Sequence, residues 1–111
     1  VDLEDAKRML KAMSGKTHRV YTGIALVNLV DNRKHIDFEC TEVTFNVLSD
    51  DEIDAYVRTG EPIDKAGAYG IQGFGALLVS RINGDYYNVM GLPLSKLNAM
   101  LKTYFQLDLL I

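Results

Sequence analysis

The pattern of hydrophobic and polar positions changes its period several times along the chain, and the first segment has the period of a helix. Between residues 2 and 13 apolar residues recur three or four positions apart, which predicts an amphipathic helix. Asp2 can cap its first turn, and Gly15 stands where a helix commonly ends. The apolar positions are Leu3, Ala6, Met9, Leu10 and Met13.

Two more segments have helical spacing. Ser49 and Glu52 form a capping box at the start of a short helix, which Gly60 closes. Ser95 is the predicted cap of a final helix. The apolar faces consist of Ile53, Tyr56 and Val57 in the first of these helices and of Leu97, Met100, Leu101 and Tyr104 in the second.

Strands are predicted where the apolar period drops to two. The run 19–30 is β-rich and ends at a polar turn, residues 31–34. The next run places Ile36, Phe38 and Cys40 on one face and then changes phase to Val43, Phe45 and Val47. A slip of one residue turns every side chain to the other face, so we expect a bulge near residues 41–42.

A second hairpin is predicted after a glycine-rich stretch. Asn83-Gly84 is the strongest short turn signal, and it separates two candidate strands, 76–82 and 85–90. Helices and strands are therefore mixed, and some strand pairing is antiparallel. We expect an α/β or α+β sheet with helices on its faces, in a single domain over residues 1–111.

Composition narrows the classes of function. Hydrophobic residues make up 48% of the chain and charged residues 24%, as in ordinary globular proteins. The net charge of −3 argues against a nucleic-acid or anionic-membrane surface, which needs a basic excess. One cysteine, Cys40, allows no internal disulfide and fits a reducing, cytoplasmic compartment. No apolar run is long enough to span a bilayer.

The stretch 60–73 is the strongest candidate for chemistry. Its glycines let the backbone approach a ligand and direct N–H groups at an anion. Lys65 can meet a phosphate, and Glu61 or Asp64 can hold a divalent metal. The carboxamide of Gln72 offers a donor beside an acceptor, which matches the edge of uracil or thymine. From spacing alone, however, tight turns before a hairpin are the favoured explanation of these glycines.

Other candidate residues favour structural roles. His18 and His35 are far apart and lack metal-ligand spacing. Cys40 alternates with apolar neighbours, so we expect it to be buried rather than nucleophilic. The serines lack the setting of a nucleophile elbow.

The stretch 60–73, GEPIDKAGAYGIQG, closely resembles the signature of the Maf family. Further matches follow in order along the chain and cover almost all of it. They are Ser14-Gly15 with His18, Thr22-Gly23, Val43-Thr44-Phe45, Leu48-Ser49, Glu52-Ile53 with Tyr56, and Asn88 through Leu94.

This resemblance implies an α/β protein of the inosine-triphosphatase-like (Maf) fold, a mixed sheet with flanking helices, whose N-terminal portion is missing here. It implies hydrolysis of dTTP or UTP to the nucleoside monophosphate and pyrophosphate, assisted by a divalent metal cation, usually Mg²⁺. Gln72 matches the family position for substrate specificity. The residues implied in substrate binding are Lys65, Asp64, Glu61, Gly70 and Gly73.

The family's first half carries Ser-x-Arg-Arg, Ala-Asp-Thr and Gly-Lys-Pro segments that have no counterpart in this chain. The aspartate among them is the implied general base, so we assign no catalytic residue here. Without these groups the chain alone is expected to lack activity, because each such contact contributes a few kcal/mol to the transition state. An exposed sheet edge and apolar face should then favour a homodimer. The alternative function is non-catalytic regulation of septum formation and cell division, with which the family is also associated.

Overall fold

The computed structural model describes residues 2–64 and 69–111, apart from the side chains of residues 63 and 64. Its elements, in chain order, are α1 (Leu3–Met13), β1 (Thr17–Asn28), β2 (Arg33–Phe45), α2 (Asp50–Arg58), the 3-10 helices η1 (Glu61–Asp64) and η2 (Gly73–Leu78), β3 (Val79–Asn83), α3 (Tyr86–Met90) and α4 (Leu94–Phe105).

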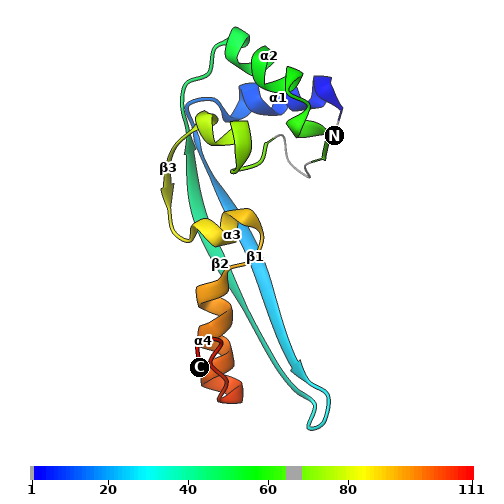
Figure 1. The fold of residues 1–111 in the computed structure, drawn as a ribbon, viewed down its shortest axis with the longest axis vertical. Coiled ribbons are helices and arrows are strands. Elements are labelled where there is room, and N and C mark those ends of the chain that lie inside the picture. Colours follow the sequence, from blue (N-terminus) through cyan, green and yellow to red (C-terminus); the bar gives the residue numbers. More distant parts are fainter. Residues whose placement is uncertain (1, 65–68) are drawn as a thin grey trace. The chain divides into compact units, whose positions relative to one another are not determined.

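The chain forms two compact units (Figure 1). Unit 1 holds Val1–Arg19 and Glu42–Asn83, and unit 2 holds Val20–Thr41 and Gly84–Ile111. The strands β1 and β2 contribute residues to both units, and each unit is described by itself below.

The sheet has three strands in the order β1-β2-β3. A four-residue turn, residues 29–32, joins β1 to β2, a connection that only antiparallel neighbours allow. The pair β2–β3 is antiparallel, with Glu42 opposite Asn83 and Phe45 opposite Val79. The prediction of a mixed α/β fold with antiparallel pairing and flanking helices is confirmed.

The bulge predicted near residues 41–42 of β2 is wrong. From His35 to Phe45 the odd-numbered positions remain on the inward side, although Glu39 and Cys40 are both half-buried, and the register shift of the pair β2–β3 lies between Thr44 and Phe45. Ile36 and Phe38 face outward, 68% and 58% exposed.

The inward face of this part of β2 is polar because α4 supplies partners for it. The ring of His35 stacks on that of Tyr104, with 3.8 Å between centroids, and Lys96 pairs with Asp37 at 3.6 Å. Cys40 is only half-buried, so its expected burial is met in part.

The predicted second hairpin is also wrong. β3 pairs with β2, and the residues after Asn83-Gly84 form the helix α3 instead of a strand. The side chain of Asp85 caps α3, and the backbone N–H of Asp85 donates to Thr41 Oγ1 at 3.0 Å. These bonds satisfy the backbone groups that a hairpin ladder would otherwise have paired.

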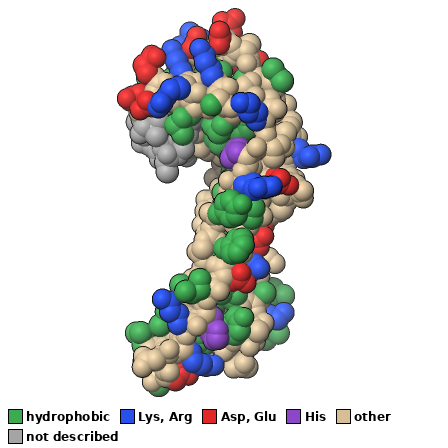
Figure 2. Space-filling view, turned by 180° about the vertical axis from the view of Figure 1, so that it is seen from behind, with side chains coloured by type: hydrophobic (Ala, Val, Ile, Leu, Met, Phe, Trp, Pro, Cys, Tyr) green, Lys and Arg blue, Asp and Glu red, His purple; other side chains and the backbone are tan. Residues whose placement is uncertain are grey.

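Unit 1 has its core between α1, α2 and the adjoining strands, and α1 and α2 lie side by side (Figure 1). Both helices form as predicted. Asp2 caps α1, and the capping box is complete, since Ser49 and Glu52 exchange bonds of 3.0 and 3.1 Å. Figure 2 shows charges of both signs interspersed over this end of the molecule, where Lys7 pairs with Asp54 at 3.2 Å.

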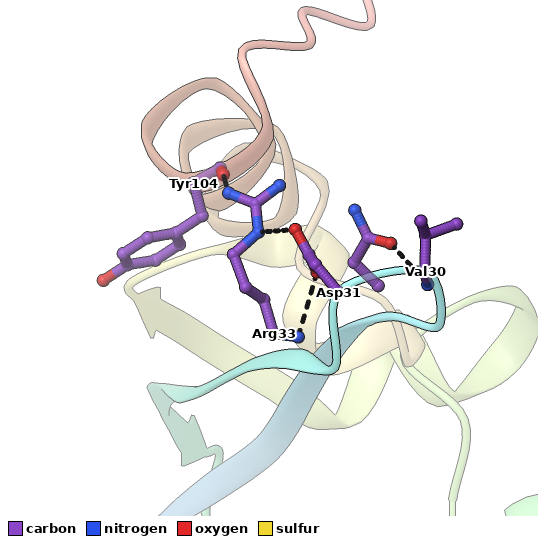
Figure 3. A network of polar contacts seen from close by, with 5 residues as sticks. Val30, Asp31, Arg33 and Tyr104 are labelled. Atoms are coloured by element: carbon purple, nitrogen blue, oxygen red, sulfur yellow. Dashed lines mark hydrogen bonds and ion pairs between the residues drawn. The ribbon is translucent and has the colours of Figure 1, made fainter.

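Two sets of contacts stabilise unit 2. The first is the group of hydrogen bonds made by the buried side chain of Asn88, which we call the buried node, and the second lies at the end of α4. The fully buried Asn88 donates from Nδ2 to Val20 O and to Thr41 Oγ1, both at 3.0 Å. At the turn after β1, Arg33 donates from Nη1 to Tyr104 O at 2.9 Å, and its Nε pairs with Asp31 at 2.6 Å (Figure 3). Arg33 thereby satisfies a carbonyl that the last turn of α4 leaves open.

The start of α4 differs from the prediction. Pro93 rather than Ser95 is its N-cap residue. Met100 is buried as expected, whereas Tyr104 is 37% exposed.

Candidate functional site

Residues 69–75 of unit 1 fold back on themselves in a compact turn, which we call the Gln72 turn. Its two ends touch, because a Cβ added to Gly75 would overlap the carbonyl oxygen of Gly70. Gly73 adopts φ +67°, a left-handed conformation that favours glycine. The glycines at positions 73 and 75 are therefore required by the geometry of the turn itself.

The carboxylate of Glu61 holds the far end of the Gln72 turn. Its Oε2 accepts from Phe74 N at 2.8 Å, and its Oε1 accepts from Gly75 N at 3.2 Å. A Cβ on Gly73 would lie 2.7 Å from Glu61 Oε2, so the turn sits directly against the carboxylate. Glu61, implied by the resemblance as a substrate contact, thus has a clear role in shaping the turn.

Two tyrosines hold the near end of the turn. The backbone N–H of Gly70 donates to Tyr56 Oη at 3.3 Å, and Tyr69 Oη lies 2.9 Å from His18 Nε2. The rings of Tyr69 and Phe45 meet edge to face, with 4.8 Å between centroids.

Burial controls the ionisation of these groups. It raises the pKa of Tyr56 to about 12, and the nearby Glu61 carboxylate acts in the same direction. Burial likewise raises the pKa of Tyr69 to about 12. Burial lowers the pKa of His18. At neutral pH the two tyrosines and the histidine are therefore all uncharged.

Gln72 lies at the surface of the turn. Its backbone is extended, with φ −91° and ψ 170°, and its side chain makes no capping bond to η2. The preceding residue, Ile71, points the other way and is only 8% exposed. The buried isoleucine fixes the turn in the core and leaves the carboxamide of Gln72 facing outward.

The remaining predicted site residues have these places. Gly70 is half-buried and Gly73 is exposed, both in the Gln72 turn. Asp64 is the last residue of η1, and its side chain lies outside the described part of the chain. Lys65 lies outside the described residues altogether.

Sequence reasoning did not assign His18, Tyr56 and Tyr69 to the site. His18 and Tyr69 are 51 positions apart, so no local pattern connects them. The one sequence signal for a role in the site was that His18 and Tyr69 both lie in segments that resemble the family motifs.

A groove beside the turn is lined mainly by apolar side chains of α2 and η2. It has a volume of about 240 Å³, and Tyr56 and Phe74 lie in its wall. Over residues 2–64 and 69–111, no cluster of three or more His, Cys, Asp or Glu side chains is placed to hold a metal ion. In the same residues no helix has the length and apolar character to cross a membrane.

The fold and the turn thus define an α/β protein that presents an exposed carboxamide on a glycine-rich turn, and comparison with known proteins gives its family. The model of the Maf-like protein family matches residues 1–104. The chain belongs to the Maf family.

Curated relatives are similar over nearly the whole chain. It is 53% identical over 109 residues to the dTTP/UTP pyrophosphatase of Alkaliphilus oremlandii, an alignment that covers 98% of this chain and 57% of the relative. It is 53% identical to the protein of the same name from Clostridioides difficile, over 94% of this chain and 54% of that relative. For Clostridium perfringens the identity is 55%, over 91% and 53%. The chain therefore spans just over half the length of these relatives.

Proposed function

We propose that the whole protein is a nucleoside triphosphate pyrophosphatase that hydrolyses dTTP or UTP to the nucleoside monophosphate and pyrophosphate. The names of the relatives support this activity, and they do not favour the alternative of a non-catalytic regulator. The observation that carries the proposal is the exposed carboxamide of Gln72 on a turn fixed at both ends.

Gln72 is proposed to recognise the base. Uracil and thymine present an N–H donor between two carbonyl oxygens, and a carboxamide can accept from the N–H while donating to one oxygen. Cytosine and adenine place an acceptor where uracil has its N–H, so a carboxamide held in one orientation loses that bond, and the unpaired polar group then disfavours the wrong base. Guanine, which carries an N–H beside a carbonyl oxygen, is not rejected by this contact.

The other residues of this chain are proposed to meet the phosphates. Lys65 can bind a phosphate oxygen as a point charge, and the backbone of Gly70 and Gly73 can approach the substrate closely, since neither carries a side chain. Asp64 and Glu61 complete the proposed substrate-binding set. Hydrolysis of a phosphoanhydride depends mainly on positioning and on charge stabilisation. Lys65 would contribute to both, whereas the two carboxylates would act through a bound cation.

A divalent cation, Mg²⁺, is the proposed cofactor. The described side chains offer no preassembled cluster of three ligands for it. Mg²⁺ commonly binds through substrate phosphates and one or two carboxylates, so its requirement is tested directly by chelation.

The proposal is tested by pyrophosphate release from a panel of nucleotides. The whole protein, with the segment that the relatives have in addition, is incubated with UTP, dTTP, CTP, ATP and GTP, with Mg²⁺ and with EDTA. We expect turnover of UTP and dTTP at least tenfold above that of CTP and ATP, and loss of turnover in EDTA. Equal turnover of all five nucleotides, or none, would refute the proposal.

Unit 2 is proposed to pair with a second copy of the chain, in the cytoplasm. Its β1–β2 hairpin exposes apolar side chains on the outer face, among them Tyr21, Val27, Ile36 and Phe38, and β1 is an edge strand. An edge and an apolar face on one hairpin suit a self-complementary contact.

Light scattering at about 100 μM, far above the Kd of a stable dimer, should report a dimer for the natural chain and a monomer for Phe38→Glu. The matched control, Val47→Glu at an exposed position of unit 1, should remain dimeric. A monomeric natural chain would contradict the pairing.

A further inference from the structure

One contact in unit 1 joins β1 to the Gln72 turn across 51 positions of sequence. His18 Nε2 and Tyr69 Oη are 2.9 Å apart, within hydrogen-bond distance. Both rings also pack on Phe45, at 5.4 Å from His18 and 4.8 Å from Tyr69 between centroids. The histidine is thus held by the core, and through it the tyrosine is held as well.

The direction of this hydrogen bond follows from the other ring nitrogen. His18 Nδ1 is buried and has no hydrogen-bond partner among the described residues. Orphaned buried N–H groups are rare, so the tautomer with the proton on Nε2 is the favoured assignment. His18 then donates to Tyr69 Oη. A neutral histidine suits this role, and burial keeps its pKa low.

Tyr69 stands three residues before Gln72, at the entry to the turn. The exit of the turn is fixed separately, by Glu61 on Phe74 N and Gly75 N. Loss of the Tyr69 hydroxyl would therefore loosen the entry alone and leave the fold of η2 in place. The added conformational freedom would affect Gln72, because its side chain makes no capping hydrogen bond to η2.

We propose that His18 is a positioning residue for base recognition, which acts through Tyr69 to fix the direction of the Gln72 carboxamide. This inference rests on the proposed role of Gln72. It assigns to His18 no contact with substrate. Substitution of His18 should therefore change which base is selected. Any change in the rate of hydrolysis at the phosphate would follow only from a misplaced substrate.

The test compares hydroxyl and imidazole deletions in the whole protein. Tyr69→Phe keeps the ring contacts and removes only Oη, His18→Leu removes the donor, and His18→Gln places an amide near the position of Nε2. We expect the ratio of kcat/KM for UTP to that for CTP to fall about tenfold in Tyr69→Phe and His18→Leu, the size of one hydrogen bond. His18→Gln should retain most of the ratio.

A double variant separates positioning from general stability. In a Gln72→Ala background, Tyr69→Phe should cause no further loss of the UTP to CTP ratio, because no carboxamide remains to be positioned. If the ratio is unchanged in Tyr69→Phe while Gln72→Ala lowers it, or if the two losses add, the inference is overturned.

Hydrogen exchange supplies a readout that does not depend on activity. Amides of residues 70–73 should exchange about tenfold faster in Tyr69→Phe, while those of α1 remain as in the natural protein. Unchanged exchange in the turn would overturn the inference whatever the kinetics show. A natural UTP preference in Gln72→Ala would instead overturn the proposed function of Gln72, and the exchange data would still decide whether His18 holds the turn.

Discussion

Alanine at Gly75 is expected to destabilise the protein by about 2 kcal/mol, because relieving the overlap breaks a hydrogen bond at one end of the Gln72 turn. The new Cβ would overlap Gly70 O and would lie 3.1 Å from Tyr56 Oη. The carbonyl cannot withdraw freely, since Gly70 N is bonded to the Tyr56 hydroxyl at 3.3 Å. Moving Gly75 instead breaks its 3.2 Å bond to the Glu61 carboxylate.

The magnitude follows from which bond is lost. A neutral hydrogen bond contributes about 1 kcal/mol and a bond to a charged group about 2 kcal/mol, so movement of Gly75 away from Glu61 gives the expected 2 kcal/mol. With a typical urea dependence of about 2 kcal/mol per molar, the unfolding midpoint should fall by about 1 M.

Equilibrium urea unfolding, followed by circular dichroism, measures this midpoint. Gly23→Ala is the matched control, because nothing lies within 4 Å of a Cβ at that position of β1. The control should leave the midpoint within about 0.5 M of the natural protein. A Gly75→Ala midpoint equal to that of Gly23→Ala would refute the close approach of the two ends of the turn.

Three further predictions concern other residues. Glu61→Gln should reduce the free energy of unfolding by about 2 kcal/mol, because one of the two backbone N–H groups would face an amide donor; a midpoint like that of the natural protein would contradict this. Asn88→Ala should cost about 3 kcal/mol in the same assay, since it leaves Val20 O without its side-chain donor, removes one of the bonds to Thr41 Oγ1 and opens a cavity inside unit 2; a loss below about 1 kcal/mol would count against the buried node. Burial lowers the pKa of His18 in the folded protein, so the unfolded chain takes up the proton at a higher pH than the folded protein does. The free energy of unfolding should therefore fall as the pH is lowered below about 6.5, and this fall should be smaller in His18→Gln. Equal pH dependence of the two proteins would disprove the burial of the imidazole.

Local chemistry allowed the helices of unit 1 to be predicted from sequence. The side chains of Asp2, Ser49 and Glu52 form hydrogen bonds with backbone amides three residues away. Their capping roles can therefore be predicted from nearby positions in the sequence. The glycine-rich stretch and Gln72 could be identified as candidate site residues for the same reason, because a turn is predicted from the residues that form it.

Nonlocal contacts explain what the sequence did not reveal. Asn83-Gly84 has the composition of a hairpin turn, yet Thr41, more than 40 positions away, binds Asp85 and starts a helix there. The outward direction of Ile36 follows from α4, whose Tyr104 and Lys96 cover the polar face of β2. The anchoring of the Gln72 turn by His18 belongs to the same class, because it depends on a fold that brings distant residues together.

The central claim is that Gln72 selects the base, and one pair of variants tests it most directly. Gln72→Asn and Gln106→Asn make the same change, shortening a side chain amide by one methylene, at the only two glutamines of the sequence. Measured as kcat/KM for UTP over that for CTP in the whole protein, the preference should fall at least tenfold in Gln72→Asn and remain unchanged in Gln106→Asn. An unchanged preference in both variants would contradict the account.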